Sequence, residues 1–243
     1  MNRSPSSEAA LPMNEKLQLW WRGFQTTKIY DFLAVTPVIA WYGMAAGHQI
    51  PALAAKLETF GVDSFGFTFM IYVLARTAGI ALTLLALMLL LVRGPAKAKA
   101  KGIFPRIAAI AGTYLSVAVV WLPPYPAGPL LSSISLLLIV GGMGFSIFAL
   151  AHLGRSFSLM AEARRLVTDG PYASIRHPLY LGEAASMLGL TLQYLSPLAF
   201  AIMAMQFGLQ LVRMKNEEQV LASLFAEYEA YRTRTARLVP GLY

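Results

Sequence analysis

Long apolar stretches separated by short basic loops make up most of this chain. No Asp, Glu, Lys or Arg occurs in residues 32–55, 107–154 or 184–212. Because roughly 20 apolar residues cross the hydrocarbon core of a bilayer as a helix, uncharged stretches of this length are typical of membrane spans. The sequence therefore predicts an all-α, multi-pass transmembrane bundle. It has about six segments: 29–48, 67–92, 103–122, 129–153, 179–195 and 197–212.

The last two segments are short, and only Ser196 and Pro197 separate them. They are expected to form a short helical hairpin, which either crosses the bilayer or turns inside it against protein or a cavity. Residues 51–63, between the first two segments, are expected to form a short interfacial segment. Because no internal repeat or low-complexity linker interrupts the pattern, residues 1–243 are predicted to form a single membrane domain.

Composition strengthens the membrane interpretation. Of the 243 residues, 57% are hydrophobic and 13% are charged, whereas an average soluble domain has roughly 25% charged residues. The net charge of +8 does not indicate nucleic-acid binding, because the Lys and Arg residues lie in short loops beside the spans. The chain has no Cys and three scattered His residues, so no metal site is expected.

Loop charges predict the orientation of the chain. Basic residues are concentrated in residues 93–106, 155–176 and 213–237, whereas the turns at 123–129 and 196–197 carry no charge. Under the positive-inside rule, all the basic loops face the cytoplasm if six spans have both termini inside. We expect an integral protein of the bacterial inner membrane, with residues 1–28 as a cytoplasmic N-terminal segment and the lipid bilayer as its surroundings.

The tail, residues 214–235, has the periodicity of an amphipathic helix. It is expected to lie along the cytoplasmic surface or to pack against the bundle. If the last span continues into it as one helix, Arg213 and Glu217 project onto its apolar face, with Glu218 at the edge. A charge on a face meant for burial is costly without a partner, so this placement indicates a function or an ion pair.

Residues 170–183 contain the densest group of side chains that could take part in binding or catalysis. Gly170 and Pro171 predict a turn, and Pro178 suits the first turn of a helix. Arg176 and His177 then lie near a helix N-terminus, where free N–H groups favour an anion. Tyr180 and Glu183 follow one and two turns further on. Such residues also anchor spans at an interface, and that simpler interpretation stays open.

The stretch 166–183 and the tail resemble the isoprenylcysteine carboxyl methyltransferases. The matching residues are Leu166 to Tyr172, Arg176 to Gly182, Arg213, Asn216, Glu217, Glu218, Leu221, Phe225, Tyr228, Tyr231 and Leu238 to Pro240. Phospholipid N-methyltransferases share the Glu pair and a Gly-x-Gly, here Gly142-Met143-Gly144. The resemblance covers residues 141–240, which are expected to be the catalytic region. It implies S-adenosylmethionine as the methyl donor.

In that family, the loop and the C-terminal helix cover the cofactor at the cytoplasmic end of the bundle. The resemblance implies Arg213 and Glu217 as the catalytic residues, with Arg213 binding the acceptor. It also implies cofactor contacts, which we assign to Arg164, Arg165, Leu166, Val167, Tyr172, His177, Pro178, Leu179, Tyr180, Glu217 and Glu218. Basic groups suit the cofactor carboxylate, Glu217 its ammonium or ribose, and tyrosine rings its adenine or cation.

The methyl acceptor is expected to be lipid-like, with the carboxylate of a prenylated cysteine as the first choice. Arg213 would hold this carboxylate in a bidentate pair. An amine or thiol acceptor remains an alternative, and an amine would need Glu183 or Glu217 as a base. Arg76, about ten residues into its span, is expected to pair with Glu183, and both are candidate substrate-binding residues.

Two other classes of protein remain possible from the sequence. Sterol-type membrane reductases, which use NADPH, carry an Arg-His-Pro-x-Tyr-x-Gly-Glu ending like residues 176–183. A transporter or scaffold is less favoured, because no broken helices recur in two repeated halves. Two departures from the methyltransferase pattern leave the acceptor open: Arg164 and Arg165 stand at a family histidine position, and the tail is one residue shorter between Phe225 and Tyr231.

Overall fold

Helices account for nearly all regular structure in the computed structural model, which describes residues 12–25, 28–58, 66–126 and 128–241. The elements are α2 (Met13–Gln25), α3 (Lys28–Glu58), α4 (Phe67–Val92), β1 (Ala98–Lys99), α5 (Phe104–Tyr114), the 3-10 helix η2 (Leu115–Trp121), α6 (Pro129–Leu153), η3 (Gly154–Ser156), β2 (Glu162–Ala163), η4 (Gly170–Ala173), α7 (Pro178–Leu192), α8 (Pro197–Leu224) and α9 (Tyr228–Arg234). β1 and β2 pair antiparallel, with Lys99 opposite Glu162. The predicted all-α class is confirmed.

Every predicted membrane segment coincides with helix. Three helical stretches are long and apolar enough to cross a membrane by length and composition: Phe69–Val92, Pro129–Ser156 and Pro197–Leu224. The other three predicted segments fall on α3, on α5 with η2, and on α7. The chain is therefore an all-α membrane protein, and six crossings stay a prediction.

Two predicted segments have a different form in the structure. The segment 51–63 is the end of α3 as far as Glu58, and its remaining residues lie outside the described part of the chain. The single tail helix over 214–235 is wrong. α8 runs without a break from Pro197 to Leu224, and the chain becomes extended at Phe225 (φ −113°, ψ 112°) before α9 begins. Arg213, Glu217 and Glu218 thus belong to α8.

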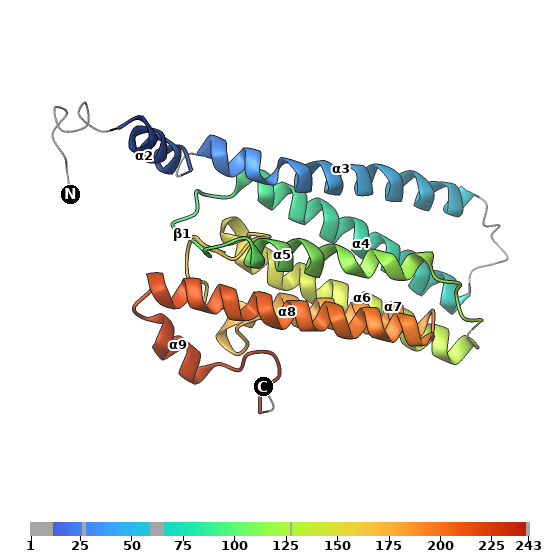
Figure 1. Cartoon of the computed structure of the whole chain (residues 1–243). Helices are drawn as coiled ribbons and strands as arrows, with labels where there is room; N and C mark the ends of the chain where they lie inside the picture. Colours follow the sequence, from blue (N-terminus) through green and yellow to red (C-terminus); the bar gives the residue numbers. More distant parts are fainter. Residues whose placement is uncertain (1–11, 26–27, 59–65, 127, 242–243) are drawn as a thin grey trace.

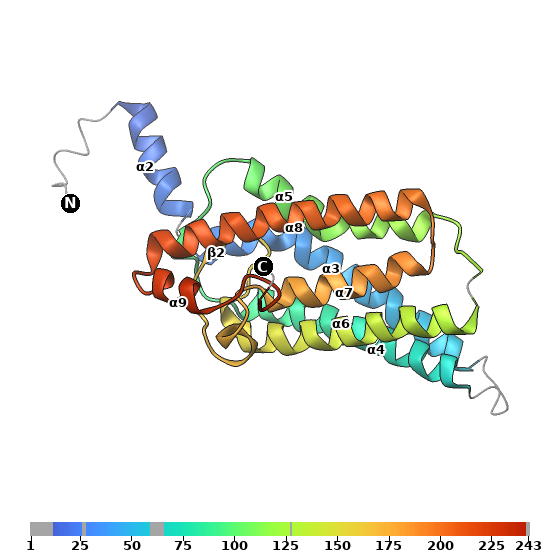
Figure 2. The same ribbon diagram turned by 90° about the horizontal axis from the view of Figure 1, so that it is seen from below.

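The helices from α3 to α8 run side by side, and their connections divide between two ends (Figures 1 and 2). We call the end with β1, β2, η4 and α9 the loop end. We call the opposite end, where η2 leads to α6 and α7 to α8, the turn end. Local signals set these connections: α6 stops at Gly154 (φ 51°), and Ser196 Oγ caps α8 by accepting from Ala199 N at 3.1 Å.

Glycines bring α6 and α7 into close contact. A Cβ atom at Gly182 would lie 2.6 Å from the carbonyl oxygen of Gly142, and one at Gly189 would lie 2.6 Å from that of Ser135. Small residues at a helix contact let backbones approach in this way. Gly142 of the Gly-x-Gly therefore serves helix packing, whereas Gly144 faces open space. This contact holds α7, and the motif before it, against α6.

Candidate active site

A cavity at the loop end brings together most of the predicted cofactor residues. Its volume is about 90 Å³, and β2, the loop from β2 to α7, the end of α8 and α9 surround it. The predicted residues that line it are Arg164, Arg165, Leu166, Val167, Tyr172, His177 and Glu217. The other lining residues are Leu153, Ser156, Ser158, Met160, Glu162, Ala163, Arg176, Leu221, Tyr228 and Tyr231. We call this the loop-end cavity.

A glycine turn and a hydrogen bond to α9 shape the loop 170–177. Gly170 has φ +57°, and a Cβ atom there would meet the ring of His152 at 2.2 Å, so this turn requires glycine. Tyr172 is buried beneath it, and its carbonyl accepts a hydrogen bond from Tyr231 Oη at 2.8 Å. Burial raises the pKa of Tyr231 to about 12, so this hydroxyl stays protonated as the donor up to a more alkaline pH than a free tyrosine does.

The C-terminal segment holds the loop against α8 through backbone hydrogen bonds. Arg176 N donates to Ala236 O at 2.8 Å, His177 N to Arg237 O at 3.1 Å, and Ala236 N to Ser174 O at 3.0 Å. This pairing resembles one rung of a parallel sheet. It places residues 174–177 between the tail and the end of α8.

Glu218 connects three parts of the loop end. Its Oε1 lies 3.1 Å from both His177 Nε2 and Arg176 Nε, and Arg237 donates to its Oε2. Charge-assisted hydrogen bonds of this kind are about twice as strong as neutral ones. Glu218 is buried and is committed to these protein partners. The geometry makes it a positioning residue, and its predicted contact with the cofactor stays a prediction.

Glu217, one residue before it, faces the cavity. Tyr180 Oη donates to Glu217 Oε1, and His177 Nδ1 lies 3.8 Å from Glu217 Oε2. The imidazole of His177 therefore lies between two carboxylates, with its ring 5.6 Å from that of Tyr180. Pro178 and Leu179 form the first turn of α7 beside this group, where they fix its backbone rather than line the cavity.

Arg213 lies deeper than Glu217, under the ring of Tyr180. Its guanidinium carbon is 5.0 Å from the centre of that ring, a cation–π distance. Arg213 Nη1 donates to Thr113 Oγ1 at 3.3 Å and Nη2 to Leu159 O at 3.2 Å. The side chain is buried, its Nε has no hydrogen-bond partner, and no carboxylate lies within 4.0 Å of it in the described part of the chain.

Glu162 is a site residue that the sequence patterns missed. It lines the loop-end cavity and lies 2.9 Å from Arg164 Nη2, 3.7 Å from Lys99 Nζ and 3.9 Å from Arg93 Nη1. Ser158 Oγ donates to it at 2.8 Å. Its pairing with Lys99 follows from the β1–β2 ladder, which joins two loops far apart in the sequence. The sequence feature that could have indicated Glu162 is that it is a single acidic residue in a basic loop.

A second cavity of about 400 Å³ lies inside the bundle, and residues of every helix from α3 to α8 line it. Arg76 and Glu183 are both among them, but the expected ion pair between them is wrong. Arg76 lies over the ring of Tyr72 at 5.3 Å, whereas Glu183 Oε2 accepts from Gln210 Nε2 at 2.8 Å. Their roles in substrate binding stay predictions. We call this the bundle cavity.

The membrane bundle and its loop-end site are found in a part of the chain that resembles a known family. Residues 131–228 match the family model of the phospholipid methyltransferases. This span contains most of the loop-end cavity and the motif at 170–183. The predicted resemblance is confirmed over that region, which is similar to this family and to two protein-S-isoprenylcysteine O-methyltransferases. The reductase alternative is not favoured.

Three known relatives show how far the similarity extends. The chain is 34% identical over 109 residues to the cobalt-zinc-cadmium resistance protein CzcN of Cupriavidus metallidurans, which is 44% of this chain and 50% of that protein. It is 36% identical over 101 residues to the protein-S-isoprenylcysteine O-methyltransferase of Schizosaccharomyces pombe, with 38% and 42% covered. The protein-S-isoprenylcysteine O-methyltransferase B of Arabidopsis thaliana is 31% identical over 119 residues, with 45% and 59% covered. The chain thus spans about half the length of these relatives.

Proposed function

We propose that the protein is an S-adenosylmethionine-dependent methyltransferase that methylates a lipid-like acceptor at the loop end of its bundle. The observation that carries this proposal is the gathering of the motif residues around one cavity. Residues 164–167, Tyr172 and His177 come from the loop between β2 and α7, and Glu217 comes from α8. Residues that only anchor helices at the membrane interface would not be expected to line one common cavity. The loop end is taken to face the cytoplasm, because the basic loops lie there.

The chemistry of the loop-end cavity fits this cofactor. Arg165 offers a cation for its carboxylate, Glu217 an acceptor for its ammonium or ribose hydroxyls, and Tyr172 a ring face for adenine. The buried hydroxyl of Tyr228 has no hydrogen-bond partner in the described structure, which leaves a polar contact for a ligand. Because about 90 Å³ is less than the roughly 300 Å³ of a small ligand pocket, the covering loop has to move outward on binding.

Arg213 is the residue that selects the acceptor. A buried guanidinium without a carboxylate in contact favours a bound anion, so we propose the carboxylate of a prenylcysteine-like acceptor as its partner. Such a carboxylate is already ionised and needs no base. When bound, the cofactor supplies an electrophilic methyl group. The protein then contributes alignment of the two groups and exclusion of water. Its catalytic residues are Arg213 toward the acceptor and Glu217 toward the cofactor.

The test is calorimetric titration of the detergent-purified protein with S-adenosylmethionine and, separately, with NADPH. We expect saturable binding of S-adenosylmethionine, weakened at least about tenfold in His177→Ala and Glu217→Gln because each removes a charged or hydrogen-bonding contact. Matched controls are His48→Ala and Glu227→Gln, at exposed positions away from the cavity, which should bind like the original protein. Binding of NADPH alone, or equal loss in the controls, would overturn the proposal.

A further inference from the structure

The helix α2 stands apart from the packed helices at the loop end. In Figures 1 and 2 it runs mainly across the direction that α3 to α8 share, and it lies level with α9 on the other side of the molecule. Residues 26 and 27 are all that separates it from α3, so the two helix ends are about 11 Å apart at most. Because α3 is a predicted membrane segment, α2 is held near the level where the chain enters the bilayer.

α2 has one apolar face. At 100° per residue, Met13, Leu17 and Trp20 fall within an arc of about 60°. Glu15 lies on the opposite side of the helix. Among the described side chains of α2, Leu19 is the large apolar one outside the arc, and it is on the same side as Glu15. The helix therefore presents two different surfaces.

The described part of the protein does not cover this apolar face. The exposed fractions of Met13, Leu17 and Trp20 are 75%, 58% and 64%. α2 has 13 residues, and a helix of this length is marginal in water unless it buries an apolar face. Residues 1–11 have Met1 and Leu11 as their large apolar residues, which are too few to cover it. The face calls for an apolar partner outside the chain.

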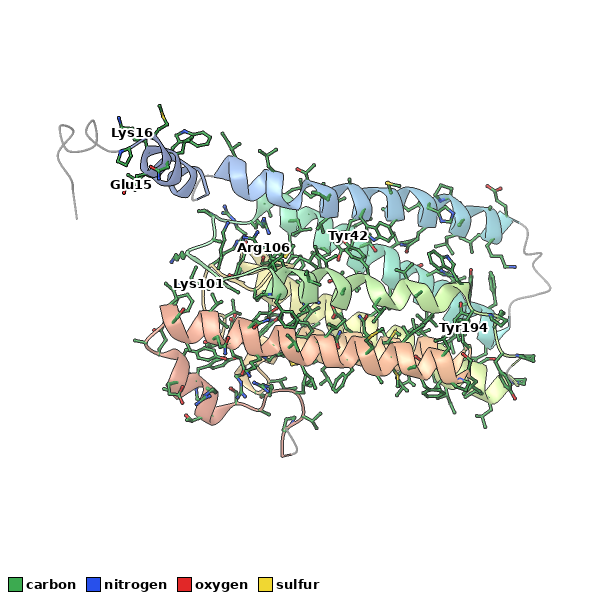
Figure 3. The ribbon with its side chains drawn as sticks, viewed as in Figure 1. Glu15, Lys16, Tyr42, Lys101, Arg106 and Tyr194 are labelled. Carbon is green, nitrogen blue, oxygen red and sulfur yellow. The ribbon has the colours of Figure 1, made fainter. Side chains whose placement is uncertain are left out.

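α2 is too short and too polar to cross a membrane. At a rise of about 1.5 Å per residue, its 13 residues span about 20 Å, less than the roughly 30 Å of a hydrocarbon core. Figure 3 shows the side chains of Glu15 and Lys16 on α2, outside the packed helices. A short helix with one apolar and one charged face is typical of helices that lie in the plane of a membrane interface.

The bilayer around the bundle is the apolar partner within reach. On α3, Ile29 and Leu33 are one turn apart and 65% and 55% exposed, so exposed apolar surface continues from α2 onto the start of a predicted membrane segment. Trp20 is on α2 at the end nearer to α3, and tryptophan is enriched at the headgroup level of membrane proteins. The direction of α2 across the bundle also places it along the membrane plane.

We propose that α2 is an interfacial anchor that lies in the phospholipid headgroup layer around the loop end. Met13, Leu17 and Trp20 face the acyl chains, whereas Glu15 and Leu19 face water. The partner of this surface is the bilayer that holds the bundle. By resting on the headgroups, α2 sets the height of α3 in the membrane. The inference does not depend on the proposed methyl transfer.

The absence of cysteine makes a direct test possible. Leu17→Cys and Leu19→Cys are matched variants of the full chain, because the same change is made at two exposed positions on different faces of α2. Each thiol is labelled with monobromobimane, and the protein is placed in phosphatidylcholine nanodiscs, in which both membrane faces are accessible. The two quenchers are iodide in the water and a phosphatidylcholine with a nitroxide near the top of one acyl chain.

We expect the lipid nitroxide to quench the Leu17→Cys label at least about threefold more strongly than the Leu19→Cys label, and iodide to show the reverse order, because only one face reaches the acyl boundary. Adding Trp20→Asp to Leu17→Cys should raise quenching by iodide and lower quenching by the nitroxide. A carboxylate on the apolar face makes contact with the acyl chains costly.

Three results would overturn the inference. Equal and strong quenching of both labels by iodide would show that α2 lies in water. Protection of the Leu17→Cys label from both quenchers would show that protein, such as a second copy of the chain, covers the apolar face. Stronger nitroxide quenching at Leu19→Cys than at Leu17→Cys would show that the opposite face meets the lipid.

Discussion

The two cavities differ in how many ion pairs and charge-assisted hydrogen bonds their lining residues make, although each also keeps an unpaired polar atom, such as the Tyr228 hydroxyl at the loop end. At the loop end, Glu218 accepts from three side chains, Glu217 from Tyr180, and Glu162 lies among three cations. In the bundle cavity, Ser146 and Gln206 keep oxygen atoms without partners. The carboxylates of the loop end are therefore paired with protein groups before a ligand arrives. The bundle cavity is lined by polar and apolar residues from six helices.

This difference fits a division of labour in a transferase. A charged donor such as S-adenosylmethionine is best bound by groups held in place in advance, because reorganising them during the reaction costs free energy. An acceptor that comes from the bilayer must instead exchange lipid for polar contacts inside the bundle. Arg213 lies at the border between the two cavities. Changes on either side of it should therefore affect one ligand and spare the other.

The largest effect is expected at this border. Arg213→Met removes the buried cation that is proposed to bind the acceptor carboxylate, so kcat/KM for the acceptor should fall on the order of a hundredfold or more. Binding of S-adenosylmethionine should change by less than about threefold, because Arg213 does not line the loop-end cavity. Steady-state kinetics with a prenylcysteine acceptor and calorimetry measure both quantities. If the substitution weakened only cofactor binding, Arg213 would act on the cofactor and not on the acceptor, which would contradict the proposal.

Glu217→Gln should give the opposite pattern. The amide keeps the shape of the side chain but loses the charge that faces the loop-end cavity, so S-adenosylmethionine should bind at least about tenfold more weakly. The KM of the acceptor, measured at saturating cofactor, should stay within about twofold. If instead both ligands weaken equally, the two cavities act as one site and the comparison fails.

The loop-end site could be predicted from the sequence because its residues lie close together along the chain. Residues 164–183 and 213–218 contain all of the predicted cofactor contacts, and each group has a strong local signal: a turn, a helix start or a charge on an apolar face. Glu162 was missed because its cations come partly from the loop after α4, and only the β1–β2 ladder brings that loop near.

The bundle cavity could not be predicted in this way. Its lining residues are spread over six helices, and α8 contributes only Gln206. A helix that is apolar on all sides carries no periodic signal that tells which face points into the bundle. The expected Arg76–Glu183 pair failed for the same reason. The sequence indicates the depth of Arg76 in its span, but it does not indicate whether the side chain reaches across the bundle to Glu183 or, as observed, lies over the ring of Tyr72 four residues earlier on the same helix.

An intermediate effect on stability is expected in the close contact between α6 and α7. Gly182→Ala would place a methyl group 2.6 Å from Gly142 O in the α6–α7 contact, an overpacking that costs about 1–3 kcal/mol. Gly144→Ala, on α6 but facing open space, is the matched control and should be neutral or slightly stabilising, because alanine favours helix. Thermal unfolding in detergent compares the two. Equal midpoints would show that the contact is looser than described.

The smallest effect is expected from Tyr231→Phe, which acts on the loop end alone. Losing the hydrogen bond to Tyr172 O should reduce stability by about 1 kcal/mol near neutral pH and weaken cofactor binding about threefold. The folded state raises the pKa of Tyr231 from 10.0 to about 12, so its protonated hydroxyl stabilises the fold fully below pH 10. As the pH rises from 10 to 12, the unfolded chain loses this proton first and the stabilisation is lost. The gap in melting temperature between the two proteins should therefore shrink above pH 10, whereas a gap that stays constant or widens there would contradict a buried, donating hydroxyl.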